Sequence, residues 1–157
     1  MPTKTIEMVV SLKVPDTTAI TALQTLQKMG FSQIKDVKRS DYYKFAIDGD
    51  AEQFRKKISK VDILVNANKH SVGFALKKNE NPEACIFFVL VKNMDDDGSG
   101  LLSTLKSRLG FKNIKKAEKA VLWEILLNTG KKGAGKITEK AAKDLLVNGN
   151  YQEYEIL

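Results

Sequence analysis

Hydrophobic and polar residues alternate near the start of the chain, as they do in a strand that buries one face. The apolar face of the segment TIEMVVSLKV holds Ile6, Met8, Val10 and Leu12. Further on, apolar residues recur every three or four positions from Ala19 to Leu26, which predicts a helix. Asp16 is placed to cap the start of this helix, and Gly30 to end it.

Two strand-like segments, SQIKDVKR and YYKFAID, follow this helix, with Ser40 and Asp41 between them. We interpret them as two strands around a tight turn. Asp50 with Gln53 three residues later is typical of a helix start. The segment HSVGFAL, residues 70–76, then reads as a strand. The first half of the chain is therefore predicted to run β-α-β-β-α-β.

The second half of the chain shows the same order of patterns. It predicts strands at 84–93, 113–119, 121–127 and 151–157, and helices at 100–109 and from about 136 to 147. The order β-α-β-β-α-β is that of a ferredoxin-like unit. The sequence therefore predicts an α+β protein made of two tandem ferredoxin-like units.

Direct similarity between the two halves indicates a duplication. The segment KMGFSQIKDVKRSDYYKFAI aligns with RLGFKNIKKAEKAVLWEILL at an offset of 80, so that Tyr43 corresponds to Trp123. ILVNANKHSVGFAL aligns with LLVNGNYQEYEIL at an offset of 82, and VVSLK aligns with FVLVK. We place repeat 1 at residues 1–77 and repeat 2 at residues 84–157, with the polar segment 78–83 as the linker.

The second faces of the two predicted sheets differ. The segment 84–91, ACIFFVLV, is apolar at every position, whereas the second face of the first strand carries Glu7, Ser11 and Lys13. A strand that is apolar on both faces is typically buried on both. We therefore expect the open face of the second unit to be covered, either by the other repeat, packed as an intramolecular pseudo-dimer, or by another subunit.

Composition and charge exclude some classes of protein. No apolar run is long enough to span a membrane. The single cysteine, Cys85, and the single histidine, His70, are too few for a Cys/His zinc cluster, and a lone cysteine fits a cytoplasmic protein. The net charge is +7, with 14 Lys and Arg against 8 Asp and Glu in residues 1–78. The lysines are spread out rather than gathered in one run, which disfavours nucleic acid as the partner.

Short motifs in the second repeat carry a resemblance to a known family. The segment DGSGLLSTLKSRLGF keeps Asp97 and Gly100 of an Asp-Pro-x-Gly turn, with Gly98 in place of proline. The segment LLVNGNYQEYEIL keeps, in register, Leu146, Asn148, Glu153, Tyr154, Glu155 and Ile156. These motifs resemble those of the small PurS subunit of phosphoribosylformylglycinamidine synthase, the amidotransferase of purine biosynthesis. The Gly-Lys pair of that family is replaced in both repeats.

The resemblance implies a role without catalysis. PurS subunits associate as dimers and bridge a glutaminase subunit to a synthetase subunit, so two fused copies resemble a dimer in one chain. We therefore expect a cytoplasmic adaptor with no active site and no cofactor of its own, whose partners are a PurL-like synthetase and a PurQ-like glutaminase, with further homo-oligomerisation left open. The candidates for contact with partners are Asp97, Gly100, Asn66, Asn148, Lys131, Lys132 and Lys136.

The segment NTGKKGAGKITEK contains Gly-x-x-x-x-Gly-Lys between an apolar run and a predicted helix, as phosphate-binding loops do. A working loop of this kind follows its lysine with Ser or Thr, which binds magnesium. Here Ile137 stands at that position, and Thr138 comes one residue late. We therefore interpret residues 130–136 as a mobile basic loop that faces a partner, with weak anion binding at the helix start left open.

Two other functions fit the same topology. RNA-recognition domains share it, and VLVKNM, residues 89–94, resembles their first-strand motif, although Leu90 replaces the stacking aromatic residue. A small-molecule-sensing domain of ACT type is also ferredoxin-like and paired, which is an argument from fold alone. The adaptor is the function that the sequence favours.

Overall fold

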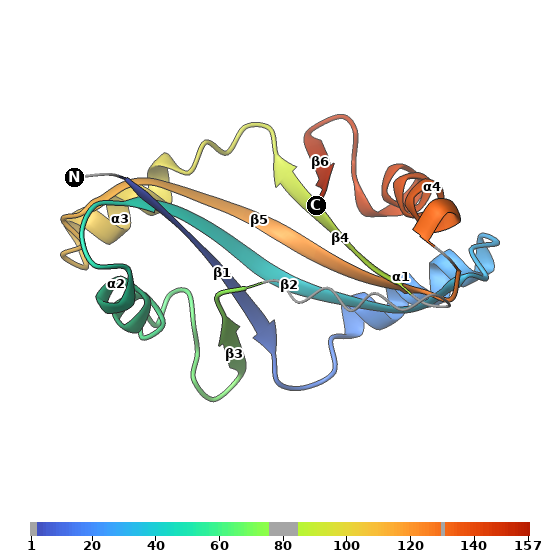
Figure 1. Ribbon diagram of the computed structural model, residues 1–157, viewed down its shortest axis with the longest axis horizontal. Helices are drawn as coiled ribbons and strands as arrows, with labels where there is room; N and C mark the ends of the chain where they lie inside the picture. Colours follow the sequence, from blue (N-terminus) through green and yellow to red (C-terminus); the bar gives the residue numbers. More distant parts are fainter. Residues whose placement is uncertain (1–2, 76–84, 130) are drawn as a thin grey trace. The chain divides into compact units, whose positions relative to one another are not determined.

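The structure, a computed structural model, describes residues 3–75, 85–129 and 131–157, so the linker 78–83 lies outside it. In chain order its elements are β1 (Lys4–Leu12), α1 (Thr17–Lys28), β2 (Ile34–Ile47), α2 (Ala51–Ile58), β3 (His70–Gly73), β4 (Cys85–Asn93), α3 (Ser99–Ser107), β5 (Ile114–Leu127), α4 (Lys131–Ala141), the π-helix η1 (Ala142–Leu146) and β6 (Gln152–Ile156) (Figure 1). The described strands form a sheet in the order β3-β1-β2-β5-β4-β6. The predicted α+β class is confirmed.

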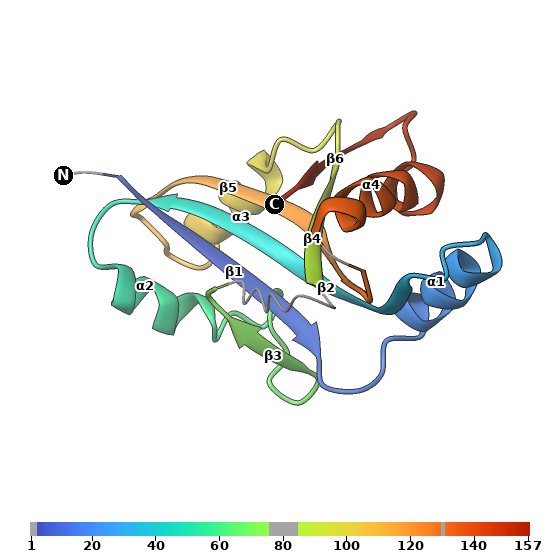
Figure 2. The same cartoon turned by 45° about the vertical axis from the view of Figure 1, so that its right-hand side comes forward.

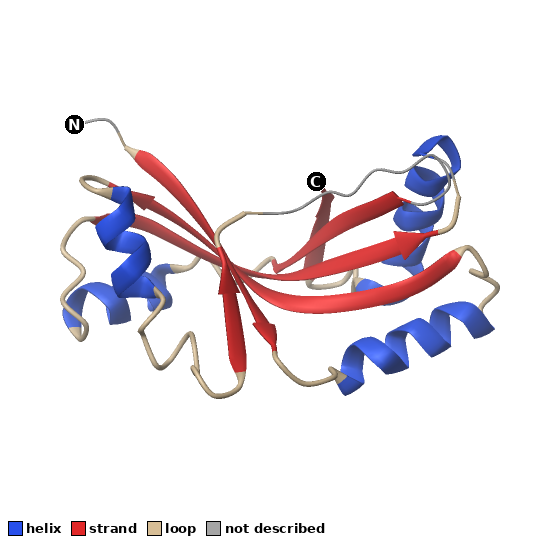
Figure 3. Ribbon diagram, turned by 60° about the horizontal axis from the view of Figure 1, so that its bottom comes forward, coloured by secondary structure: helices blue, strands red, loops and turns tan. Residues whose placement is uncertain are grey.

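Strands β2 and β5 each run unbroken where the sequence predicted two strands and a turn. β2 continues through Ser40 and Asp41, and β5 continues through Ala120 and Val121 (Figure 3). A two-residue hairpin turn usually places residues at positive φ, and among the described residues only glycines have a positive φ. The predicted turn at Ser40 and Asp41 and the predicted break between the strands 113–119 and 121–127 are wrong, and each half of the chain runs β-α-β-α-β.

The chain divides into two compact units, and each combines segments from both halves of the sequence. Unit 1 comprises Met1–Lys13, Asp41–Leu76 and Asp95–Ala120, and unit 2 comprises Val14–Ser40, Lys77–Met94 and Val121–Leu157. The boundaries fall inside β2 and β5, so each unit receives part of both long strands. The repeats at 1–77 and 84–157 stay a prediction about the sequence, and the compact units cut across them.

Unit 1 closes its core with residues from both halves. Phe45 and Phe54 of the first half pack with Leu105 and Phe111 of the second. The ring centroid of Phe54 lies 5.3 Å from that of Phe45 and 5.8 Å from that of Phe111, both in edge-to-face contact. Figures 1 and 2 show the loop from α3 to β5 beside the start of α2. The first-half segments of unit 1 therefore share one core with α3 and the residues that follow it.

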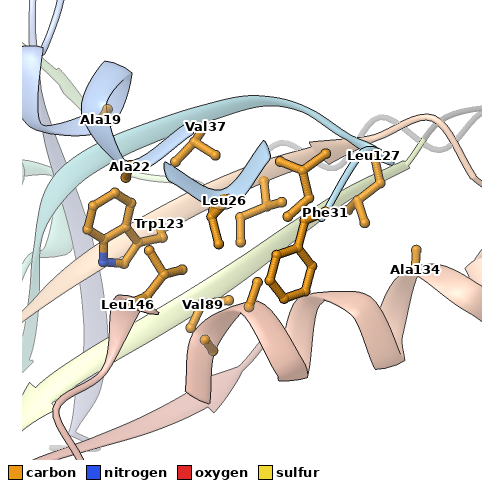
Figure 4. Close-up of a cluster of buried hydrophobic side chains, with 14 of the residues drawn as sticks. Ala19, Ala22, Leu26, Phe31, Val37, Val89, Trp123, Leu127, Ala134 and Leu146 are labelled. Atoms are coloured by element: carbon orange, nitrogen blue, oxygen red, sulfur yellow. The ribbon is translucent and has the colours of Figure 1, made fainter. Parts of the chain in front are cut away.

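Unit 2 has a core of the same mixed origin. Ala22 and Leu26, on α1 of the first half, pack with Val89, Trp123 and Leu146 of the second. Figure 4 shows the Trp123 ring beside Ala22 and Leu146. Burial of these apolar side chains stabilises unit 2 only when both halves of the chain are present.

The predicted helix starts at Asp16 and Asp50 are confirmed. The Asp16 carboxylate accepts hydrogen bonds from the amides of Thr18 and Ala19 and also pairs with Arg39 at 3.0 Å. The Asp50 carboxylate accepts hydrogen bonds from the two amides at the start of α2 in the same way. Both caps depend on residues next to them in the sequence, which is why local pattern predicts them.

Both faces of β4 are buried, as the sequence predicted. Val89 and Val91 face the helices, and on the alternate positions Phe88 and Leu90 are also buried. Leu90 lies opposite Leu122 of β5, which is buried too. The expectation that the other repeat or another subunit covers this second face stays a prediction.

Candidate partner interface

Asn66 closes the turn that leads into β3. Its carbonyl oxygen accepts hydrogen bonds from the amides of Lys69 (3.0 Å) and His70 (2.7 Å), and its side-chain oxygen accepts one from the Asn68 amide (3.0 Å). The imidazole of His70 completes the turn, since its Nδ1 accepts the Asn66 amide at 2.9 Å. Asn66 lies at the surface, and its hydrogen bonds hold the turn.

Asn148 closes an equivalent turn before β6. Its carbonyl oxygen accepts the amides of Tyr151 (3.2 Å) and Gln152 (2.7 Å), and its side-chain oxygen accepts the Asn150 amide (3.1 Å). The Oε1 atom of Gln152 accepts the Asn148 amide at 3.0 Å, the role that His70 has in unit 1. The two predicted interface residues therefore hold the same turn, one in each unit.

Strand register places these turns at corresponding points of the sheet. Leu12 lies opposite His70 in the β1–β3 pair, and Asn93 lies opposite Gln152 in the β4–β6 pair. Leu12 therefore corresponds to Asn93, whereas our alignment of VVSLK with FVLVK matched it with Val91. That alignment is wrong by two residues, a shift that keeps the same residues on the buried face because strand side chains alternate.

The surface beside the two turns differs in character. In unit 1 the Lys13 amide donates a hydrogen bond to the Lys69 carbonyl at 2.8 Å. The side chains of Lys13 and Lys69 are both exposed, and Lys13 Nζ donates to the Ala67 carbonyl at 2.7 Å. In unit 2 the matching bond, also 2.8 Å, joins the Met94 amide to the Tyr151 carbonyl, and these side chains are 56% and 53% exposed. The surface beside this turn is therefore basic in unit 1, at Lys13 and Lys69, and apolar in unit 2, at Met94 and Tyr151.

Asp97 and Gly100 lie at the start of α3, and both are exposed. The hydroxyl and amide of Ser99 donate hydrogen bonds to the Asp97 carboxylate and hold the pKa of Asp97 below its ordinary value. Gly98 between them has φ +80°, and a Cβ atom there would overlap the Ala117 carbonyl oxygen. Only glycine fits that position. The turn is therefore a structural start for the helix, with Asp97 on its outer side.

The basic segment predicted as a loop is instead the first part of a helix. α4 spans Lys131–Ala141, so the prediction of a loop over 130–136 is wrong from Lys131 onward. Beyond the first turn, helix amides bond within the helix, so the segment does not wrap a phosphate group. Lys136 is exposed, whereas the side chains of Lys131 and Lys132 lie outside the described part of the chain.

Unit 1 also contains a cavity of about 710 Å³, between α2 and the segment that leads from α3 into β5. Its floor includes the buried side chains of Phe54 and Phe111. Gln53 and Lys57, four residues apart on one face of α2, line one side together with Lys60 in the turn that follows the helix. This cavity was not predicted from the sequence, although the polar residues Gln53, Lys57 and Lys60 at helical spacing were a signal for one of its walls.

Unit 2 contains a smaller cavity of about 420 Å³, between α1 and the end of the last helical segment. Threonines from α1 line one side, and Trp123 and Leu145 contribute to the other. Leu145 belongs to η1, where the helix changes from α to π geometry after Ala141. The wider turn is closed by the Val147 amide, which donates to the Ala142 carbonyl at 2.9 Å.

No group of three His, Cys, Asp or Glu among the described residues could hold a metal ion. Cys85 is buried, with Sγ 3.4 Å from the Thr129 carbonyl oxygen. Burial, with a smaller contribution from Asp41, raises the pKa of Tyr43 to about 12, so its hydroxyl stays protonated at neutral pH. No helix in the described ranges is long and apolar enough to cross a membrane.

Comparisons with known proteins give no family for the chain, because no protein-family model and no curated protein matches it. The function is therefore inferred from the sequence motifs and from the geometry of the two units.

Proposed function

We propose that this chain is a non-catalytic adaptor of PurS type, which holds a synthetase and a glutaminase subunit together in the phosphoribosylformylglycinamidine synthase step of purine biosynthesis. The short motifs of the second repeat motivate the proposal. The observation that carries it is the equivalence of the Asn66 and Asn148 turns, which have the same hydrogen bonds and lie one in each unit. Fusion of two subunits of an interlocked dimer would give this duplication.

The element order of each unit supports an interlocked origin. In unit 1, α3 and residues 114–120 fit the places of the first helix and second strand of a ferredoxin-like unit, and they come from the second half of the chain. In unit 2, α1 and residues 34–40 fit the same places, and they come from the first half. We infer two ferredoxin-like units that have exchanged one helix–strand segment, as in domain swapping.

The different surfaces beside the Asn66 and Asn148 turns support binding to two different partners. An adaptor that joins two unlike proteins needs two unlike surfaces, because specificity is a difference in affinity between partners. Lys13 and Lys69 of unit 1 suit an acidic surface, and Met94 and Tyr151 of unit 2 suit an apolar one.

The burial of the strand aromatic residues favours an adaptor over an RNA-binding domain. RNA-recognition domains stack bases on exposed aromatic side chains of the sheet. In unit 1, Tyr43 and Phe45 are stacked 6.2 Å apart inside the core, and Tyr42 on the other face is buried. In unit 2, Phe88 is buried as well.

Mixing the purified chain with the synthetase and glutaminase subunits of the same source tests the proposal. With glutamine and an adenine nucleotide present, we expect a ternary complex in size-exclusion chromatography with light scattering. Lys13→Glu/Lys69→Glu should lose one partner, and Met94→Ser/Tyr151→Ser should lose the other. If neither subunit binds the wild-type chain under these conditions, the adaptor role is wrong.

A further inference from the structure

We propose that the 710 Å³ cavity of unit 1 is a docking pocket for an acidic peptide segment with an apolar anchor residue, supplied by a partner protein. This inference deepens the adaptor role and rests on it for the existence of a partner. The site is not among the residues that the sequence motifs single out.

The floor of the pocket is apolar and rigid. Phe54, Val61 and Phe111 are buried, and the edge-to-face contacts of Phe54 with Phe45 and Phe111 fix its ring. A volume of 710 Å³ lies within the range of preformed binding sites, about 300–1,000 Å³. The pocket therefore has room for a large apolar side chain, which would leave water on binding there.

The chain turn after α3 builds one wall of the pocket. Gly110 has φ +73°, which lets the chain reverse there, and the Phe111 amide then donates to the Leu105 carbonyl at 3.0 Å. This turn puts Phe111 in the core and leaves Leu109 at the surface. On the same wall, Asn113 Nδ2 donates to the Asp48 carbonyl at 2.7 Å, which fixes the polar end.

The rim of the pocket carries exposed apolar side chains, which favours a chain segment as the occupant. Ile63 is 61% exposed and Leu109 is 43% exposed, and both line the same cavity. A small molecule that fills the cavity would leave their outer surfaces in water. A peptide that crosses the mouth would cover them and gain the burial of that area.

The charges at the mouth select an acidic segment. Lys57 and Lys60 line the cavity and are exposed, and neither has an ion pair within the part of the chain that the structure describes. Two carboxylates also line the cavity: that of Asp50 accepts the amides at the start of α2, whose positive helix end offsets part of its charge, and that of Asp62 is exposed. Lys56 extends the basic surface along α2. Complementary charge speeds encounter and fixes the direction of a bound peptide.

Selection from a random dodecapeptide library on the full-length chain tests the pocket without any assumed partner. We expect the enriched peptides to combine Leu, Ile or Phe with two or more acidic residues. Fluorescence anisotropy of a synthesised enriched peptide should then show at least about tenfold weaker binding to Lys57→Glu/Lys60→Glu and lower affinity at high salt. Lys35→Glu/Lys38→Glu, which makes the same change in net charge at exposed positions of unit 2, should change the affinity less than about twofold.

A peptide whose acids are replaced by their amides provides a measurement that does not depend on the folding of a variant. It should bind the wild-type chain at least about tenfold more weakly than the acidic peptide. Enrichment of peptides without acidic residues, or equal affinity for Lys57→Glu/Lys60→Glu, would overturn the proposal.

The two proposals fail separately. If the synthetase and glutaminase bind Lys57→Glu/Lys60→Glu as well as they bind the wild-type chain, the pocket is not the docking site and the adaptor role stands. If acidic peptides bind the pocket but neither subunit binds the chain, the purine adaptor role is wrong and the peptide site stands.

Discussion

Units 1 and 2 share a backbone plan, and they differ in the side chains that the plan supports. In unit 1 the turn before the edge strand is completed by His70, and in unit 2 by Gln152, yet each side chain accepts the same asparagine amide. Beside these turns, lysines in unit 1 stand where Met94 and Tyr151 stand in unit 2. The hydrogen bonds that define the backbone are alike, and the outward surface is where the units differ.

The helix packing of the two units differs in the same way. α2 of unit 1 packs through Phe54, whose ring also forms the floor of the docking pocket. α4 of unit 2 packs through Ala134 and Ala141, both fully buried, so its backbone lies close to the sheet. A large side chain on one helix and small ones on the other give two differently shaped surfaces from one topology.

Separating the two halves of the chain should have the largest effect. Because each unit takes core residues from both halves, we expect residues 1–78 and 79–157, expressed apart, to form no folded monomer. Equimolar mixing should restore the helical circular dichroism and give a one-to-one complex in light scattering. A folded monomer of either half would contradict the shared cores.

Truncation of one core leucine in each unit should have the second largest effect. Leu26 of α1 and Leu105 of α3 are fully buried, and their carbonyls accept the amides of Phe31 and Phe111, each at 3.0 Å. Leu26→Ala and Leu105→Ala should each lower the free energy of unfolding by about 3–5 kcal/mol in urea titrations. Because β2 and β5 contribute to both units, both variants should shift the fluorescence transition of Trp123 in unit 2. If Leu105→Ala leaves that transition in place, the units unfold independently.

Substitution of Gly98, at the start of α3, should have a smaller effect. Gly98→Ala places a Cβ atom against the Ala117 backbone at positive φ, and should cost about 2–4 kcal/mol of unfolding free energy. The matched control is Gly100→Ala two residues later, where nothing lies within 4 Å, and which should stabilise the protein by up to about 1 kcal/mol. Thermal unfolding of the two variants measures the difference, and equal midpoints would show that the backbone at Gly98 relaxes.

Local signals in the sequence were enough to predict β1, α1 and both aspartate caps. The unbroken course of β2 through Ser40 and Asp41 could not be predicted from local signals. These residues lie where β2 passes from the core of unit 2 to that of unit 1. They are polar because they lie between the two cores, and two polar residues between apolar segments resemble a turn in the sequence. The glycines of α4 likewise lower helix propensity, while burial of Ala134 favours the helix.

The candidate partner interface, like the fold, could be predicted from the sequence only where its signals are local. Asn66 and Asn148 could be singled out because their turns are local and have the same hydrogen bonds in both halves of the chain. The docking pocket was missed because its floor joins Phe54 to Phe111, and these residues are distant in the sequence. A spacing pattern identifies one helix face, but the opposing wall depends on tertiary packing.

Exchange of the two turn acceptors should have the smallest effect, and it probes whether the turns are equivalent. His70→Ala leaves the Asn66 amide without its acceptor and should cost about 1 kcal/mol of unfolding free energy. His70→Gln should recover most of this loss, since Gln152 performs that role in unit 2. The reverse change is not symmetrical, because Gln152 Nε2 also donates to Asn93 Oδ1 at 3.0 Å. Gln152→His should therefore be less stable than His70→Gln in urea titrations, and the opposite order would show that the turns differ in more than their side chains.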